Sequence, residues 1–409
     1  DADFLVAFHY MNTPQRLYRG NYILGHFVQI TDSNGEIFSR NPGDLDAPAI
    51  ACAFSYEHVH EAVVAAQRGM AAWRRLATSD RLSALSKYRG KLSDRAESVA
   101  ELICFETGKP LWEAREELSE TLAIIDYYLA TAQNASSETL SKEDGTGFAT
   151  RVNHYPRGVV AIVSPGICPV SDTHLHLIPA LAHGNAVVFK ASRHAPLVGQ
   201  ALAEILHDAQ IPAGVFNLVQ GDAEVARRLV SHADVQVVLY TGSYETGLKV
   251  QKQLLSDYWK IVVLDMVGKN GVLIWDDSHY HQALHETVYS AFLTTGQRRT
   301  TASRVLVHHS LLERFQKDFH ALAKKASVGY GYTPSEQAPF LGPLLNDEAV
   351  ENYIRYQGIA VREVFNEVQY DLDRAILHHV FERLVPVRGW RNYRRGTVAG
   401  RFWPNCDYS

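Results

Sequence analysis

The chain has 409 residues, of which 46% are hydrophobic and 21% are charged, and its formal net charge is −5. This length is enough for two or three folding units. The chain is weakly acidic and lacks the excess of basic residues that is typical of a dedicated nucleic-acid binder, so the composition argues against that class of protein. The four cysteines (Cys52, Cys104, Cys168 and Cys406) are too scattered for a CxxC zinc site or a disulfide framework, which favours a reducing, cytoplasmic setting.

The N-terminal part predicts short strands followed by helices. Residues 22–24 and 27–30 resemble strands bounded by turn signals, and we interpret residues 1–54 as an opening hairpin layer. Apolar residues then recur at helical spacing over 55–73, from Ser79 onward, and over about 112–132. Residues 134–150 are polar and rich in turn formers, so they predict a protruding hairpin or a linker.

The middle of the chain alternates apolar strands with helices. Strands are expected at 159–163, 186–189, 215–219 and 235–240, and this alternation is typical of a parallel sheet that is covered on both faces. A second alternation of strands and helices begins with a predicted strand at 261–264. It continues through a strand at 271–274, a helix at 279–295, a strand at 304–307 and a helix at 310–326, which predicts a second α/β domain.

Several loops that follow predicted strands carry polar or cationic groups: Ser164–Pro169, Lys190–Arg193, Gln220–Asp222 and Thr241–Gly247. Ligands of open parallel sheets bind where such loops lie, at the carboxyl ends of the strands. Thr241, Gly242 and Ser243 could present N–H groups and a hydroxyl to a pyrophosphate at a helix N-terminus. A plain strand-to-helix turn is the alternative interpretation.

An ordered set of motifs resembles the aldehyde dehydrogenase superfamily, most closely its succinylglutamic semialdehyde dehydrogenase branch, over roughly residues 20 to 345. The motifs are Phe105–Pro110, Pro179–Lys190, Ile211–Val219, Tyr240–Ser243, Leu264–Asn270, Gly296-Gln297 and Glu363–Phe365. The resemblance implies an α/β fold with a Rossmann-type nucleotide-binding domain (1–133 and 152–263) and an α/β catalytic domain (264–362). It also implies a small β oligomerisation arm or tail (134–151 and 390–409), and hence a homo-oligomer, most simply a dimer.

The resemblance further implies a dinucleotide, NAD or NADP. Lys190 would contact the adenosine ribose, Ser243 the pyrophosphate and Glu363 the nicotinamide ribose; an alternative is that these are inherited turn and salt-bridge residues. Arg193 stands where many members have a ribose-binding glutamate. This favours NADP over NAD, because arginine can bind the 2′-phosphate that NADP carries. Gly166 replaces a bulky residue in many members and is expected to loosen the cleft. The full cofactor set is Ser164, Lys190, Ser192, Arg193, Thr241, Gly242, Ser243 and Glu363.

The three catalytic positions implied by the resemblance are all substituted. Members use a cysteine thiolate, an oxyanion-binding asparagine and a glutamate general base, and these positions hold Arg299, Ile167 and Asp265. A guanidinium cannot replace the nucleophile. Isoleucine has no donor, and the loss of one oxyanion donor alone costs about 10²–10³ in rate. Aspartate keeps the carboxylate but withdraws it by one methylene.

Two groups near these positions could supply other chemistry. Cys168 is the one cysteine that could stand in as a nucleophile, although a buried small hydrophobe is the more common role. His174, His176 and His183 are close in sequence, but no acidic or cysteine ligand completes a metal spacing. We interpret them as core or helix-surface histidines and predict no metal.

Our leading hypothesis is a pseudoenzyme with a binding, regulatory or structural role, whose ligand is a dinucleotide or a small carboxylate. The rival is a divergent enzyme on a carboxylated semialdehyde, with Asp265 as base and Arg298 or Arg299 as anion clamp; on a strand, only one of two adjacent arginines would face the pocket. A third possibility is an assembly module whose contact surface is Arg388–Arg395, a cluster that could otherwise bind nucleic acid. No long apolar run or signal peptide indicates a membrane partner.

Overall fold

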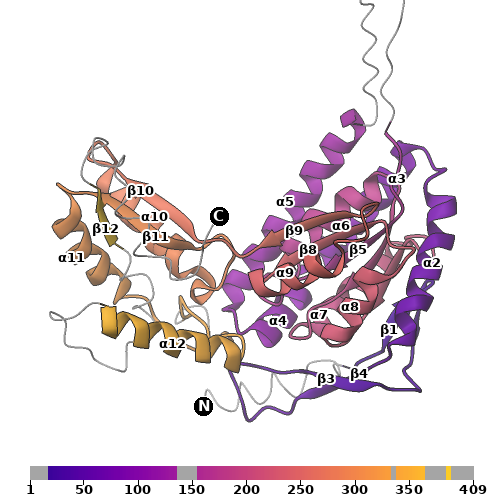
Figure 1. The fold of residues 1–409 in the computed structure, drawn as a ribbon, viewed down its shortest axis with the longest axis horizontal. Coiled ribbons are helices and arrows are strands. Elements are labelled where there is room, and N and C mark those ends of the chain that lie inside the picture. The colour runs from indigo at the N-terminus through magenta and orange to yellow at the C-terminus, as the bar shows by residue number, and fades with distance from the viewer. Residues whose placement is uncertain (1–16, 136–153, 333–337, 364–383, 388–409) are drawn as a thin grey trace, which may run out of the picture. The chain divides into compact units, whose positions relative to one another are not determined.

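A computed structural model describes residues 17–135, 154–332, 338–363 and 384–387, and divides the chain into two compact units (Figure 1). The first unit is formed by residues 1–267, 297–299 and 327–349. The second unit is formed by residues 268–296, 300–326 and 350–409.

The first unit is built on a seven-stranded sheet of order β2-β1-β7-β6-β5-β8-β9. Five neighbouring strands are parallel, and β1 joins β7 in the antiparallel sense. A separate antiparallel hairpin joins β3 and β4. The strands are β1 (Asn21–Ile23), β2 (His26–Val28), β3 (Gly35–Ser39), β4 (Ile50–Phe54), β5 (Val159–Val163), β6 (Ala186–Lys190), β7 (Phe216–Val219), β8 (Val237–Gly242) and β9 (Ile261–Met266).

Helices cover both faces of this sheet. The helices are α2 (Glu57–Trp73), α3 (Thr78–Asp94), α4 (Ala96–Thr107), α5 (Leu111–Ala135), α6 (Ser171–Ala182), α7 (Pro196–Asp208), α8 (Ala223–Ser231) and α9 (Tyr244–Gln253). Successive strand side chains point to opposite faces, so Val160 and Ile162 of β5 join one core cluster while Val159 and Ala161 join the other. This double burial explains why β5 is apolar at every position.

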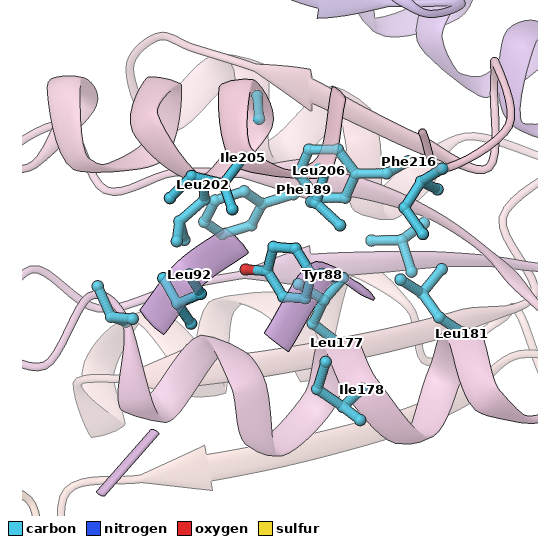
Figure 2. Close-up of a cluster of buried hydrophobic side chains, with 14 of the residues drawn as sticks. Tyr88, Leu92, Leu177, Ile178, Leu181, Phe189, Leu202, Ile205, Leu206 and Phe216 are labelled. Atoms are coloured by element: carbon cyan, nitrogen blue, oxygen red, sulfur yellow. The ribbon is translucent and has the colours of Figure 1, made fainter. Parts of the chain in front are cut away.

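The larger cluster lies between the sheet and helices α3 to α7. Figure 2 shows its centre, where Tyr88 and Leu92 of α3 meet side chains of α6, α7 and the strands. The labelled partners are Leu177, Ile178, Leu181, Phe189, Leu202, Ile205, Leu206 and Phe216. This packing fixes the start of α6 and α7 relative to the sheet, and those starts adjoin the loops that carry the predicted site residues.

The second unit contains a three-stranded parallel sheet of order β10-β11-β12. Its described elements are β10 (Asn270–Ile274), α10 (Tyr280–Phe292), the short 3-10 helix η1 (Leu293–Gly296), β11 (Ala302–His308), α11 (Leu312–Ala323), α12 (Asp347–Glu363) and β12 (Leu384–Val387). Phe292, Phe315 and Phe319 pack together between its helices. This unit thus combines parallel strands with helices, as in an α/β unit.

The structure corrects the prediction for residues 261–264 and adds two helices. We expected that segment to open the second sheet, but β9 pairs in parallel with β8 as the edge strand of the first sheet. Sequence periodicity cannot tell which neighbour a strand pairs with. Helices α4 and α12 were not predicted. The predicted strands at 22–24 and 27–30 are present, but they extend the main sheet instead of forming a layer of their own.

His174 of α6 provides a pH-dependent test of this core. Its ring is buried between Tyr88 Oη, at 2.7 Å from Nε2, and the carbonyl oxygen of Val170, at 2.6 Å from Nδ1. Burial lowers the pKa of His174 to about 4, so the folded chain keeps the ring neutral while the unfolded chain takes up a proton below about pH 6.5. Stability that is present above pH 6.5 is therefore lost as the pH falls, by up to about 1.4 kcal/mol per pH unit.

We expect urea unfolding midpoints of the unchanged protein to fall more steeply between neutral and mildly acidic pH than those of His174→Gln. Glutamine keeps polar atoms at this position but does not titrate in this range. Equal pH slopes in the two proteins would contradict the assignment.

Candidate functional site

Strands β8 and β9 bring Thr241 and Asp265 side by side at one edge of the first sheet. The two residues are register partners in neighbouring parallel strands, both near the carboxyl end. Thr241 is buried, and its Oγ1 lies 3.0 Å from Nε2 of His176 in α6. Burial lowers the pKa of His176, so this ring is neutral near physiological pH. The edge therefore combines a carboxylate, a hydroxyl and a neutral imidazole.

Arg299 forms ion pairs with two carboxylates at this edge. Its Nη1 lies 2.8 Å from Oδ2 of Asp265, and its Nε donates to Oδ1 of Asp172, 3.1 Å away in the first turn of α6. The side chains of Arg299, Asp172 and Asp265 are 25%, 14% and 31% exposed, so solvent screens these pairs only in part. Burial raises the pKa of Asp172, and the guanidinium opposes that rise. The cation thus holds together two carboxylates that would otherwise repel each other.

A second group of charges surrounds the thiol of Cys168. Lys109 Nζ lies 2.5 Å from Oε2 of Glu117 and 3.5 Å from the cysteine Sγ. Arg298 Nη2 lies 3.3 Å from Oε1 of Glu113. Burial raises the pKa of Cys168 to about 12, despite the opposing effect of Lys109. The thiol is therefore protonated at physiological pH, and a thiol is a much weaker nucleophile than a thiolate.

Buried glutamates cap the two helices that follow β5 and β6. Glu117 Oε1 accepts hydrogen bonds from the N–H groups of Val170 and Ser171, at 2.9 and 3.1 Å, at the start of α6. Glu106 accepts from Leu197 N and Val198 N, at 3.0 and 2.9 Å, at the start of α7. Neither helix has a side-chain cap of its own. Carboxylates of the protein itself thus occupy these two N-terminal positions, which would otherwise attract a ligand anion.

Four residues of this site were not predicted from the sequence: Lys109, Glu113, Glu117 and Asp172. Glu113 and Glu117 are one helical turn apart on α5, and both are fully buried. Two carboxylates at this spacing on an apolar helix face are a usable signal, because buried carboxylates require partners. Lys109 lies within the motif Phe105–Pro110, directly after Gly108, whose left-handed conformation (φ 74°) ends α4.

Ser164, Ser192 and Arg193 follow β5 and β6. The Ser164 hydroxyl accepts a hydrogen bond from Thr173 Oγ1 at 2.8 Å, and the Ser192 hydroxyl accepts one from His194 N at 3.2 Å. Arg193 is more exposed; its Nε donates to His194 Nε2, and its Nη2 lies 3.8 Å from Glu348 Oε2. Their role toward a dinucleotide stays a prediction.

Thr241, Gly242 and Ser243 lead directly into α9. The Ser243 hydroxyl accepts from Thr246 N at 3.3 Å and so caps this helix, whereas the starts of α6 and α7 are capped by carboxylates. Lys190, the last residue of β6, is buried and only 5% exposed. Glu363 ends α12 in the second unit, and its side chain lies outside the described residues. The structure thus gathers the predicted cofactor residues of the first unit at the carboxyl ends of its strands.

A Cβ atom at Gly166 would lie 3.0 Å from Ser192 Oγ and 3.2 Å from both His194 Cβ and Leu345 Cδ2, so a larger side chain there would require its neighbours to move. That the glycine loosens the cleft stays a prediction. One expectation about the site was wrong. Arg298 and Arg299 do not lie on a strand, and the turn that contains them lets both side chains reach carboxylates of the first unit. Half-buried Ile167 lies between Gly166 and Cys168 and offers no side-chain hydrogen-bond donor.

The three histidines have different surroundings. His174 is a core residue, as predicted, whereas His176 joins the edge that holds Asp265 and His183 is half-buried at the end of α6. In the described part of the chain, no three histidine, cysteine or acidic side chains are grouped as metal ligands would be. None of the described helices is long and apolar enough to cross a membrane. Residues 136–153 and 388–409, which include most of the predicted arm, lie outside the description.

Comparison with known proteins gives a family match over most of the chain. Residues 30–369 match the model of the aldehyde dehydrogenase family. The N-succinylglutamate 5-semialdehyde dehydrogenase of Burkholderia mallei is 35% identical over 329 residues, which cover 80% of this chain and 66% of the relative. The chain thus spans slightly less than two thirds of the length of this curated relative.

Solved structures show the same fold. An NADP dependent enzyme of E. coli matches with a TM-score of 0.79 and 27% identity, over 86% of this chain and 72% of that one. An aldehyde dehydrogenase from Brucella melitensis matches with a TM-score of 0.80 and 25% identity, over the same shares of the two chains. The α/β architecture expected from the motifs is therefore confirmed.

Proposed function

Because this chain belongs to the aldehyde dehydrogenase family, we propose that it is a member that does not oxidise aldehydes and serves as a binding, regulatory or structural protein. The observation that carries the proposal is the double ion pair of Arg299 with Asp172 and Asp265. A guanidinium has no lone pair with which to attack a carbonyl carbon. The guanidinium also occupies Oδ2 of Asp265, the carboxylate at the position of the general base.

The surroundings of Cys168 and Ile167 support the same proposal. Cys168, which follows Ile167 directly, has a buried, protonated thiol with a pKa of about 12. Ile167 cannot donate a hydrogen bond to an oxyanion, so covalent attack from Cys168 would also lack that stabilisation. The three family groups act together in one reaction. Loss of the nucleophile alone removes that reaction, so the rate losses from the other two substitutions are not multiplied with it.

The proposed ligand is a dinucleotide, with NADP preferred over NAD. The buried ammonium of Lys190 would donate a hydrogen bond to a ribose hydroxyl oxygen. The start of α9 at Ser243 would face the pyrophosphate, and Arg193 would meet a 2′-phosphate. When bound, the nicotinamide would be able to accept a hydride. We further propose that the protein is a cytoplasmic homodimer. Its nucleotide-binding domain would comprise residues 1–133 and 152–263, its catalytic-type domain residues 264–362, and its oligomerisation arm residues 134–151 and 390–409. Calorimetric titration with NAD and NADP tests whether the cleft accepts either molecule.

We expect no NAD- or NADP-linked oxidation of aliphatic or carboxylated aldehydes by the purified protein. Absorbance of the reduced nicotinamide measures this directly, with an active family member assayed in parallel as the positive control. Turnover that disappears in Asp265→Ala or in Cys168→Ala would contradict the proposal and identify the group responsible.

The second candidate is a divergent enzyme that acts on a carboxylated semialdehyde, the kind of substrate named for the Burkholderia relative. It requires an arginine that is free to bind the substrate carboxylate. Carboxylates of the chain already hold both Arg298 and Arg299, which counts against this candidate. A rise in melting temperature with a small dicarboxylate or semialdehyde, but none with a dinucleotide, would favour it.

A further inference from the structure

The first turn of α2 carries two histidines, and each places its Nδ1 atom against a polar atom of another element. His58 Nδ1 lies 3.0 Å from Nδ2 of Asn21, a fully buried residue of β1. His60 Nδ1 lies 3.0 Å from Nε2 of His232, the residue that follows α8. The paired residues are 37 and 172 positions apart, so these contacts fasten the start of α2 to distant parts of the first unit.

The direction of the hydrogen bond at His58 is fixed by a backbone group. Oδ1 of Asn21 lies 2.7 Å from the N–H group of Gln220, directly after β7, and a backbone N–H can only donate. The amide oxygen of Asn21 is therefore the acceptor of that bond, and its Nδ2 is the end that faces His58. Since an amide nitrogen only donates, Nδ1 of His58 is the acceptor and carries no proton.

The direction of the hydrogen bond at His60 is fixed in the same way. The N–H group of Asp234 donates to Nδ1 of His232, 3.2 Å away, so that nitrogen carries no proton. A neutral imidazole has one N–H, which in His232 is therefore on Nε2 and is donated to Nδ1 of His60. Both histidines of α2 are thus held as hydrogen-bond acceptors.

Protonation breaks both arrangements, because an imidazolium has a proton on each nitrogen and accepts nothing. Protonated Nδ1 of His58 would face the N–H groups of Asn21, and turning that amide would set its N–H groups against the backbone N–H after β7. Protonated Nδ1 of His60 would face the N–H of His232. Moving the proton of His232 to its Nδ1 would set it against the backbone N–H that it now accepts from. One hydrogen bond is lost in every case.

We propose that the first turn of α2 is a pH-sensitive clasp. Above about pH 6.5, where imidazoles are mostly neutral, its two histidines accept hydrogen bonds and hold the helix to β1 and to the end of α8. At lower pH, protonation releases both contacts. The release also affects Gln220, which shares the Asn21 amide with His58 and lies at the edge where ligands of parallel sheets bind. The clasp does not depend on whether the protein oxidises aldehydes.

Charged groups of both signs surround the clasp. Burial lowers the pKa of His232; Asp234 opposes this effect, whereas His60 and Lys260 add to it. Because both signs are present, their effects on the histidines cancel in part. The other charged residues around this turn, on α2 and on or beside α8, are Glu57, Glu61, Asp222, Glu224 and Arg228.

The first test is a double-mutant cycle on His60 and His232. The unchanged chain, His60→Ala, His232→Ala and the double variant are unfolded in urea at about pH 8 and about pH 5.5, on either side of the usual imidazole pKa. At the higher pH we expect a coupling of about 2- to 10-fold in the unfolding equilibrium constant, the range for one hydrogen bond. At the lower pH the coupling should be lost or reversed. Titration of distant groups such as His174 is common to all four proteins and cancels.

Asn21→Asp is the matched variant for the other contact. Aspartate keeps an oxygen for Gln220 N, but its second oxygen would accept a hydrogen bond from protonated His58. Acidification from about pH 8 to about pH 5.5 should therefore lower the urea midpoint of this variant less than that of the unchanged protein. Adding His58→Ala to Asn21→Asp should abolish this difference, which separates the clasp from the titration of a buried aspartate.

Three results would overturn the proposal. The first is a coupling between His60 and His232 that is absent at about pH 8 or equal at the two pH values. The second is an Asn21→Asp variant that loses as much stability on acidification as the unchanged chain. The third is a difference that persists without His58. The cycle decides the matter even if Asn21→Asp does not fold, because His60 is exposed and His232 is half-buried.

Discussion

Arg299→Cys is expected to yield no aldehyde oxidation, although it places a thiol at the position that the motifs assign to the family's nucleophile. Ile167 would still provide no oxyanion donor, a deficit of about 10²–10³ in rate. The new thiol would also lie beside Asp172 and Asp265, whose negative charges disfavour a thiolate. Initial rates with NAD and NADP, measured beside the unchanged protein, check this result.

The same substitution is expected to destabilise the first unit by about 1–3 kcal/mol, because it removes the cation between two partly buried carboxylates. Arg299→Lys retains one positive charge and should lose less stability. A combined variant with Arg299→Cys, Ile167→Asn and Asp265→Glu restores all three family groups and is the matched test of recoverable activity. Turnover in the single variant Arg299→Cys would show that the assignment of Ile167 is wrong.

Glu117→Ala is expected to lower the free energy of unfolding by about 3–5 kcal/mol, the largest change predicted for a single substitution in this chain. It leaves the ammonium of Lys109 buried beside Cys168 without its carboxylate. It also removes the acceptor for Val170 N and Ser171 N at the start of α6. Chemical denaturation followed by tryptophan fluorescence measures the loss.

Glu97→Ala is the matched control, because Glu97 forms a short ion pair with Arg115 on the surface, where both side chains are more than half exposed. Surface pairs contribute about 0–1 kcal/mol, so this variant should unfold nearly as the unchanged protein does. A double variant, Lys109→Met with Glu117→Ala, should recover part of the loss by removing the uncompensated charge. Equal losses for Glu117→Ala and Glu97→Ala would contradict the importance of burial.

Local patterns in the sequence were sufficient to predict the α/β fold and the family. A strand that is buried on both faces is apolar throughout, as in Val159–Val163, and this pattern is visible without any knowledge of its neighbours. Motif order along the chain then indicated the aldehyde dehydrogenase family, which the comparisons confirm. The identities of Arg299, Ile167 and Asp265 also came from the sequence, because they depend only on alignment with those motifs.

Tertiary structure alone decided what those residues contact. Arg299 and Asp172 are 127 positions apart, and the pair forms only because the turn at 297–299 packs against the start of α6. Strand β9 belongs to the first sheet because its backbone pairs with β8, a choice that its own apolar residues do not encode. Lys109 and Lys190 both lie in family motifs, yet within the described residues a carboxylate pairs with Lys109 and none pairs with Lys190. Burial and pairing depend on the whole fold, so the sequence indicated which groups are present, and the structure determined which of them are neutralised and which remain available.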